Sequence, residues 1–253
     1  MKTGIKIMGV VLAFLFLGHF TASAQNGMST GFGPVSISLG GNNGGNLDMG
    51  IKVLFMLTLL SLAPSLLLLM TCFTRIVIVL SFVRSALQLQ GTPASQIIIG
   101  LSLFMTYFIM APVWDGINRD AIVPYEAHSI SDQEAMDRAS AHIRTFMLRQ
   151  TRPKDVELFV SMARIQATDA SKLPLRVVIP AFVISELRTA FQMGFLIYVP
   201  FILIDIVVAT VLMSMGMMMM PPTTISLPLK LLLFVLVDGW ALIVQSLVHS
   251  FGM

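Results

Sequence analysis

The chain of 253 residues is 56% hydrophobic and only 11% charged, and its mean hydropathy is +0.85. Soluble domains carry about 25% charged residues, so this composition excludes a soluble globular protein and indicates an integral membrane protein. The formal charge of +3 falls further when Lys2 and Lys6 leave with a predicted signal peptide, which argues against nucleic-acid binding. The single cysteine, Cys72, excludes a disulfide framework within the chain and a multi-cysteine metal site.

Residues 1–24 are predicted to be a cleavable signal peptide. Lys2 and Lys6 supply the positive start, an apolar run follows, and a small-residue Ala-Ser-Ala cleavage site ends the segment. The alternative is an uncleaved first membrane span. Residues 25–48, rich in Gly, Asn and Ser, are predicted to be a disordered tail, because they hold too little apolar surface to offset the entropy of ordering.

Residues 49–114 are predicted to form N-terminal hydrophobic helices. The first apolar region contains Arg75 and Arg84, and a second, uncharged run covers Ile97–Val113. With the N-terminus outside the cytoplasm, both arginines lie toward the cytoplasmic side, as the positive-inside rule prefers. An alternative position for Arg75 is burial between subunits.

Residues 115–176 are predicted to form a polar, all-helical extracytoplasmic insert, which holds nine acidic and nine basic residues. Ser131 and Glu134 have the spacing of a capping box, which predicts that a helix begins there. The stretch Arg152-Pro153-Lys154-Asp155 marks a break, and Val156–Ala167 has the apolar spacing of a second helix.

Residues 177–253 are predicted to form a C-terminal hydrophobic helical hairpin with a methionine-rich loop, and Ile225–Phe251 is its last span. The stretch Pro180–Pro222 is about twice the ~20 residues that cross a bilayer core, so one straight span cannot account for it. Glycine and proline residues are expected where the helix bends or breaks and where the chain turns. The predicted hinge residues are Gly194, Pro200, Pro221 and Pro222.

Five charged residues of this region are predicted to be buried or to lie between subunits, because an ionisable group in hydrocarbon costs about 2.5–3.5 kcal/mol on insertion scales. They are Glu186, Arg188, Asp205, Lys230 and Asp238. In a hairpin centred on the two prolines, Asp205 lies about 16 residues before the turn and Lys230 about 8 after it, a mismatch of ~12 Å. An Asp205–Lys230 pair is therefore expected between staggered neighbouring subunits rather than within one chain.

Six methionines fall within residues 213–220, which we call the methionine cluster. Three interpretations compete. The cluster is irregular core filler, since methionine adapts to gaps; or it is a soft-metal site, since thioethers suit Cu(I) although no His or Cys lies nearby; or it is a deformable seal around a symmetry axis. The third interpretation requires a helix break that faces the axis.

The sequence contains no phosphate-binding GxxxxGK[ST] loop, no HExxH motif and no dinucleotide-binding glycine fingerprint. The four histidines are far apart, and no nucleophile is placed beside a base. We therefore expect neither enzymatic activity nor a cofactor.

Three long motifs resemble the FliP family of flagellar type III export-gate subunits: PAFVISELRTAFQMGF at 180–195, DIVVATVLMSMGMMMMPP at 205–222, and LVDGW at 236–240. The resemblance covers nearly everything after residue 50. It implies an all-α, integral membrane-type protein of bent helical hairpins with a helical extracytoplasmic insert, assembling into a helical oligomeric channel. It also implies that the hydropathic segments lie between subunits rather than against lipid.

The resemblance further implies partners. Members of the family form a pentamer with FliQ-type and FliR-type subunits, beside FlhB-type and FlhA-type proteins, and FliO-type proteins assist assembly. The expected location is the bacterial inner membrane at the flagellar basal body, with much of the assembly on the periplasmic side. The exported flagellar proteins are further partners.

The family's methionine gasket corresponds to Met217, Met218 and Met219, and Met220 extends the run. Its charged positions correspond to Glu186, Asp205 and Lys230. The expected function is the passage of unfolded flagellar substrates through a pore. The alternative is a proton-coupled membrane transporter or channel that uses Glu186, Asp205 and Asp238 as a relay, because carboxylates within a membrane commonly carry protons.

Overall fold

The computed structural model describes residues 54–58, 60–62, 65, 68–88, 93–165, 173–217 and 220–252. The predicted signal peptide and the Gly/Asn-rich tail lie outside these residues. The chain divides into two compact units, residues 1–58 and 59–253. In the first unit, the described residues 54–58 are helical. The helices α3 to α10 all belong to the second unit.

Every regular element in the described part of the chain is a helix, and no strand occurs there. The elements are α3 (Phe73–Ala86), α4 (Ser95–Ile117), the π-helical turn η1 (Asn118–Ile122), α5 (Val123–Glu126), α6 (Asp132–Gln150), α7 (Pro153–Met162), α8 (Leu175–Ser214), α9 (Thr223–Leu236) and α10 (Gly239–His249). The predicted all-α membrane fold is thus confirmed. Among the described residues, two helices are long and apolar enough to cross a membrane, Ser95–Glu126 and Leu175–Ser214, and the bent pair α9–α10 makes a third if it is one span.

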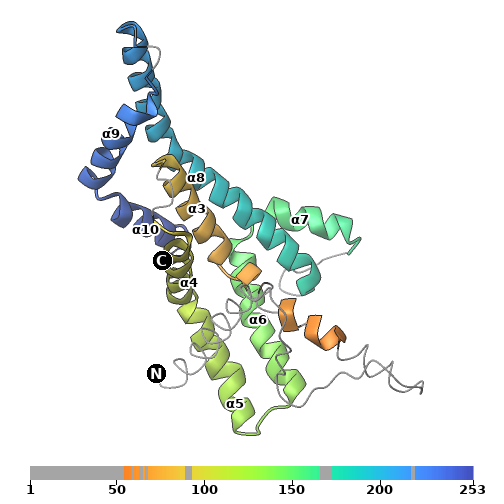
Figure 1. The fold of residues 1–253 in the computed structure, drawn as a ribbon. Helices are drawn as coiled ribbons and strands as arrows, with labels where there is room; N and C mark the ends of the chain where they lie inside the picture. The colour runs from red at the N-terminus through yellow and green to blue at the C-terminus, as the bar shows by residue number, and fades with distance from the viewer. Residues whose placement is uncertain are drawn as a thin grey trace, which may run out of the picture. The chain divides into compact units, whose positions relative to one another are not determined.

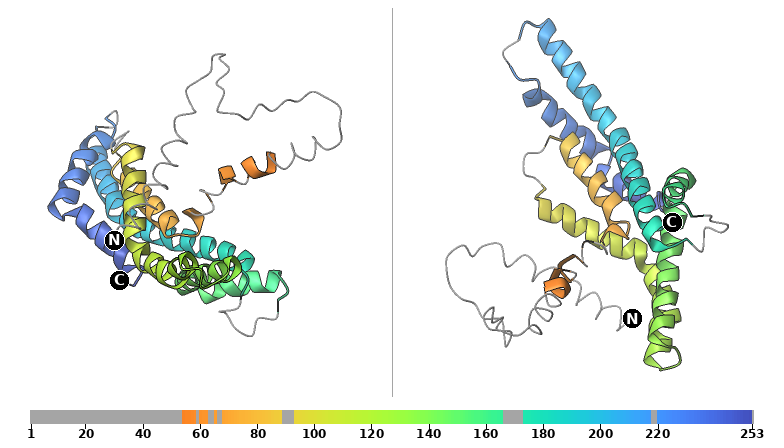
Figure 2. Two further views of the ribbon diagram at one scale, coloured as in Figure 1. Left: turned by 90° about the horizontal axis from the view of Figure 1, so that it is seen from below. Right: turned by 90° about the vertical axis from the view of Figure 1, so that its right-hand side faces the viewer.

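Helix α8 is the longest element, and α3 and α9 lie alongside it (Figures 1 and 2). Its 40 residues correspond to about 60 Å, roughly twice the thickness of a bilayer core. The helix continues through Pro180 and Pro200, so the predicted break at Gly194 or Pro200 does not occur. A proline removes only one hydrogen bond, and packing along the rest of a long helix keeps it continuous.

Gly194 serves the contact between α8 and α3. A Cβ atom at this position would lie 2.4 Å from Cδ2 of Phe82, so only glycine lets the two helices approach this closely. Helix α3 also supplies the centre of the hydrophobic core. Ile76, Val79 and Val83 recur at helical spacing, so they lie on one face of α3, and this face is fully buried. A bending function for Gly194 and Pro200 stays a prediction.

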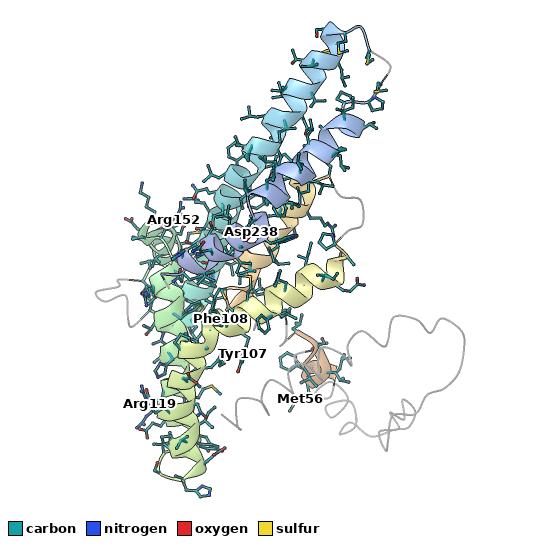
Figure 3. All side chains as sticks on the ribbon, turned by 90° about the vertical axis from the view of Figure 1, so that its left-hand side faces the viewer. Met56, Tyr107, Phe108, Arg119, Arg152 and Asp238 are labelled. Carbon is teal, nitrogen blue, oxygen red and sulfur yellow. The ribbon has the colours of Figure 1, made fainter. Side chains whose placement is uncertain are left out.

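The predicted last span, Ile225–Phe251, contains a sharp bend. Helices α9 and α10 meet at an angle of 63°, and Asp238 lies at this corner with φ of 50° (Figure 3). A Cβ atom on Gly239 would lie 2.3 Å from the ring of Phe234, which also packs edge-on against Trp240. The corner therefore depends on a residue that tolerates the left-handed conformation and on a glycine beside an aromatic ring.

The polar insert is helical, as predicted. Ser131 is the N-cap of α6, and its side chain accepts a hydrogen bond from the backbone N–H of Glu134 at 3.3 Å. Helix α7 begins at Pro153, three residues before the predicted start at Val156, because proline suits the first position of a helix. Arg152 is its N-cap, and the helix ends at Met162, before the predicted end at residue 167. The predicted boundary at residue 115 is not a break, because the helix of α4 continues through η1 and α5 to Glu126.

Candidate functional site

A buried ion pair joins α3 to α8. Arg75 Nε donates to Glu186 Oε2 at 2.8 Å, and Arg75 Nη2 donates to Glu186 Oε1. The two side chains are only 2% and 0% exposed. Planar guanidinium and carboxylate groups match each other in this two-pronged geometry, which makes it among the strongest pairings available to a buried charge.

Three further residues complete the environment of Arg75. Its Nη1 donates to both the backbone oxygen and the Oγ of Ser250 at 3.0 Å, and its Nη2 lies 3.4 Å from Oε1 of Gln150. The guanidinium carbon lies 3.9 Å from the ring centroid of Phe251, whose backbone oxygen accepts from Gln150 Nε2 at 3.2 Å. The charge pair thus ties together α3, α6, α8 and the residues after α10. We call this group the Arg75 cluster.

A second pair joins α8 to α9. Lys230 Nζ donates to Asp205 Oδ2 at 2.6 Å, and Gln88 Nε2 donates to the same oxygen at 3.1 Å. Lys230 Nζ also lies 3.4 Å from the backbone oxygen of Ala86, in the last turn of α3, where carbonyl groups lack partners within the helix. Lys230 is 1% exposed, whereas Asp205 is 31% exposed. We call this group the Lys230 cluster.

The prediction that Asp205 and Lys230 pair between subunits rather than within one chain is wrong for this pair. The depth estimate counted residues 215–222 as helix, but α8 ends at Ser214 and α9 begins at Thr223. Asp205 lies nine residues before Ser214, and Lys230 lies seven residues after Thr223, so the two positions are nearly level. The residues between the two helices therefore do not count toward the distance of either side chain along its helix.

The other two predicted charges are not buried within the chain. Arg188 is half exposed, and its Nη1 lies 3.6 Å from Oδ1 of the buried Asp155 on α7. Asp238 is exposed at the corner between α9 and α10. An intersubunit position for either residue stays a prediction.

The proposed relay carboxylates are not brought together. Glu186 and Asp205 lie on the same helix, nineteen residues and therefore about 28 Å apart. Each is held by a basic side chain of its own, Arg75 or Lys230. Asp238 lies on none of the three helices that supply these pairs, because it is the N-cap of α10. The geometry supports separate structural pairs better than a proton relay.

The methionine cluster lies at the end of the α8–α9 hairpin, away from α6 and α7 (Figure 1). Four of its side chains are exposed: Met213 by 57%, Met215 by 64%, Met217 by 44% and Met220 by 45%. Core filling within the chain is therefore wrong for these four residues. Met218 and Met219 lie outside the described residues. Pro222 is the N-cap of α9, and the Pro221-Pro222 step lies in the connection where the chain reverses.

Sequence reasoning missed most partners of the two charge pairs. Gln88, Gln150 and Ser250 are ordinary polar residues at helix ends, and no local pattern marks them. The pairing of Arg75 could have been predicted, because an arginine within the apolar run 72–82 requires a buried hydrogen-bond acceptor.

The chain is thus an all-α integral membrane protein that pairs its buried charges and exposes at least four methionine side chains at the end of a helical hairpin. Residues 56–247 match the sequence model of the FliP family. The chain belongs to this family.

Relatives from distant bacteria agree with this assignment. The chain is similar to the flagellar biosynthetic protein FliP of Bacillus subtilis (strain 168), with 56% identity over 81% of this chain and 94% of the relative. It is 48% identical to the flagellar biosynthetic protein FliP of Aquifex aeolicus (strain VF5), over 86% of this chain and 91% of the relative. It is 49% identical to the protein of the same name from Pectobacterium carotovorum, over 83% and 82% of the two chains.

Proposed function

We propose that this chain is a pore-forming subunit of the flagellar type III protein export gate in the bacterial inner membrane. It performs no covalent chemistry and needs no cofactor. Unfolded flagellar proteins pass through a channel that several copies of the chain build together. Membership of the FliP family, whose relatives are named flagellar biosynthetic proteins, supports the flagellar part of this proposal.

The pore-forming role is supported by the exposure of four methionines of the cluster at the end of a hairpin. Flexible, polarisable thioether side chains pack against partners of irregular shape. Four such side chains in one chain, repeated around an axis, make an apolar ring that closes on itself and yields to a passing polypeptide. The two charge clusters fix the hairpin that carries the ring, since they join α8 to α3 and to α9.

The apolar outer faces of the helices support assembly with further copies and partners. Phe191, Phe195 and Leu196 on α8, and Leu232 and Leu236 on α9, are exposed in the single chain. Contiguous apolar surface of this kind marks contact with lipid or with protein. Five copies, together with FliQ-type and FliR-type subunits and with FlhB-type, FlhA-type and FliO-type proteins nearby, would cover it, with much of the assembly on the periplasmic side.

The test replaces Met217, Met218 and Met219 with alanine in the assembled complex and records ion leak across the membrane together with flagellar protein export. We expect a higher leak with export retained, because alanine is too short to close the ring. The matched control replaces Met136 and Met162, exposed methionines on α6 and α7, with alanine and should leave the leak unchanged. An unchanged leak in a fully assembled triple variant would contradict the seal.

A further inference from the structure

A histidine joins α6 to the long helix that precedes it. The helix Ser95–Glu126, made of α4, η1 and α5, is followed by a short connection and then by α6, which packs back against it (Figure 1). Across this interface, Nε2 of His142 on α6 lies 3.0 Å from Oδ2 of Asp120 in η1. Both side chains belong to one chain, so the contact requires no neighbouring copy.

The helix opposite His142 is shaped to receive its ring. A Cβ atom on Gly116 would lie 2.9 Å from both Cε1 and Nδ1 of His142, so the ring occupies the space that any other side chain at position 116 would need. Asp120 lies in η1, a π-helical turn, and such turns within α-helices occur frequently at functional sites. Packing against the backbone and the contact with Asp120 therefore hold the imidazole in one place.

Two arginines complete the surroundings of Asp120. Arg138, one turn before His142 on α6, donates from Nη1 to the backbone oxygen of Asp120 at 3.3 Å and from Nη2 to Oε1 of Glu134 at 2.6 Å. Arg119 donates from Nε to Oδ1 of Asp120 at 2.9 Å. The carboxylate of Asp120 thus accepts from a cation on its own helix and faces the imidazole across the interface.

Of these groups, only the imidazole changes its charge near neutral pH. Unperturbed imidazole titrates between about pH 5 and 8, whereas aspartate and arginine side chains keep their charges there. Protonated His142 forms an ion pair with Asp120, while neutral His142 leaves at most a hydrogen bond. The contact therefore contributes most to stability at acidic pH, and this contribution declines as the pH rises.

The nearby arginines do not outweigh the carboxylate. Arg119 is 79% exposed and Arg138 is 43% exposed, so water and salt screen both charges. Arg138 is also paired with Glu134. The Asp120 carboxylate oxygen, at 3.0 Å, is the charged atom in direct contact with the imidazole of His142.

Other charges on α6 and on the helices that pack against it have less influence. Those on α4, α5 and α8 are exposed to solvent or, for Glu186, neutralised by Arg75, and those on α6 lie away from the face that carries His142. The residues concerned are Asp115 on α4, Glu126 on α5, Arg176 on α8, and Asp137 and Arg144 on α6.

We propose that the His142–Asp120 contact is a pH-sensitive joint, which strengthens the packing of α6 against the helix Ser95–Glu126 when the compartment that bathes these residues becomes acidic. Helix α6 ends at Gln150, which contacts Arg75 and Phe251, so the joint acts on a helix that reaches the Arg75 cluster. The inference goes beyond the proposed function and does not require a pore.

The first test is a double-mutant cycle in the full-length chain, purified in detergent. The variants H142Q, D120N and H142Q/D120N are unfolded thermally at about pH 5.5 and about pH 8, on either side of the imidazole titration. The coupling is the effect of H142Q in the wild type minus its effect in D120N. It should be larger by about 2–4 °C at the acidic pH, because only protonated His142 forms the ion pair. Equal coupling at the two pH values would overturn the proposal.

A matched control replaces the exposed His128, in the connection after α5, with glutamine. The effect of H128Q on the unfolding midpoint should be the same at both pH values, because no comparable carboxylate contact is lost. If H128Q and H142Q depended on pH to the same extent, the sensitivity would not belong to the joint, and the proposal would be wrong.

The second test needs no variant. Hydrogen exchange of the wild type is followed at both pH values and corrected for the intrinsic pH dependence of exchange, with α9, which contains no histidine, as the internal reference. Amides of η1 and α6 should become several-fold better protected at the acidic pH relative to those of α9, because a stronger contact opens less often. A parallel change in α6 and α9 would contradict a local joint.

Discussion

The Arg75 and Lys230 clusters both bury a positive charge against α8, yet they differ in completeness. In the Arg75 cluster, both carboxylate oxygens of Glu186 accept hydrogen bonds, and all three guanidinium nitrogens of Arg75 have partners. In the Lys230 cluster, Asp205 Oδ1 and Gln88 Oε1 are buried without a hydrogen-bond partner in the described part of the chain. The charged atoms of the Arg75–Glu186 pair thus all have hydrogen-bond partners, and we call this cluster saturated. In the Lys230 cluster, two side-chain oxygens could still accept a hydrogen bond, and we call it unsaturated.

The two clusters therefore contribute differently to stability. A saturated buried pair fixes the packing of the helices that supply it, and it is damaged severely when one partner is removed. An unsaturated, partly exposed pair contributes less to stability and is screened by salt. The Arg75 cluster is therefore expected to hold the fold together, while the Lys230 cluster sets the hairpin that carries the methionine cluster.

The largest expected effect comes from Glu186→Ala. This change leaves the Arg75 charge buried without its carboxylate, and it should destabilise the chain by about 3–5 kcal/mol. The measurement is thermal unfolding of the purified protein in detergent, where the midpoint should fall by on the order of 10 °C. The double variant R75M/E186L, which removes both charges, should recover part of the loss, and a variant E186A as stable as the wild type would contradict the comparison.

Asp205→Ala should have a smaller effect, about 2 kcal/mol, because the carboxylate is partly exposed and Lys230 keeps the backbone oxygen of Ala86. Raising the salt concentration should reduce the difference between D205A and wild type but leave that of E186A nearly unchanged. Unfolding midpoints measured at low and high salt test this. The distinction between the clusters fails if D205A is the more damaging change.

Gly194→Ala tests the helix contact that lies between the two clusters along α8. The added Cβ would lie 2.4 Å from Cδ2 of Phe82, so α3 and α8 must separate, with an expected loss of about 1–3 kcal/mol. Gly100→Ala on α4 is the matched control, because no atom lies within 4 Å of its Cβ position. G100A should be neutral or up to about 1 kcal/mol more stable, since alanine favours helix over glycine. Equal stability of the two variants would contradict the packing role of Gly194.

The smallest effect is expected from Arg188→Ala. Its guanidinium is half exposed and lies 3.6 Å from the Asp155 carboxylate, a geometry that contributes less than about 1 kcal/mol. The unfolding midpoint of the single chain should shift by no more than a few degrees. Loss of assembly at unchanged chain stability would move Arg188 to an interface between subunits. A large loss of stability would show that the buried carboxylate of Asp155 needs the guanidinium of Arg188 as its partner within the chain.

Much of the fold could be predicted from the sequence because it follows from local patterns. Apolar runs of the right length predicted the membrane helices, and Ser131 with Glu134 predicted the start of α6. A break between α6 and α7 was predicted, but Pro153 was assigned to the break, whereas it is the first residue of α7. The prolines inside α8 led to a wrong prediction of a break. Packing against neighbouring helices keeps α8 continuous, although a proline would destabilise the same helix in isolation.

Hydropathy and residue spacing are properties of the chain alone, so they were enough to predict the class of protein, the helices, and the presence of charges that need partners inside apolar segments. Which charges meet could be seen only once the helices were packed. Glu186 lies 111 residues from Arg75, and Lys230 reaches Asp205 because α8 ends at Ser214 and α9 begins at Thr223, which brings the two side chains to the same depth. Pairing depends on where the chain reverses and on the depth of each side chain, and these are set when the helices pack together.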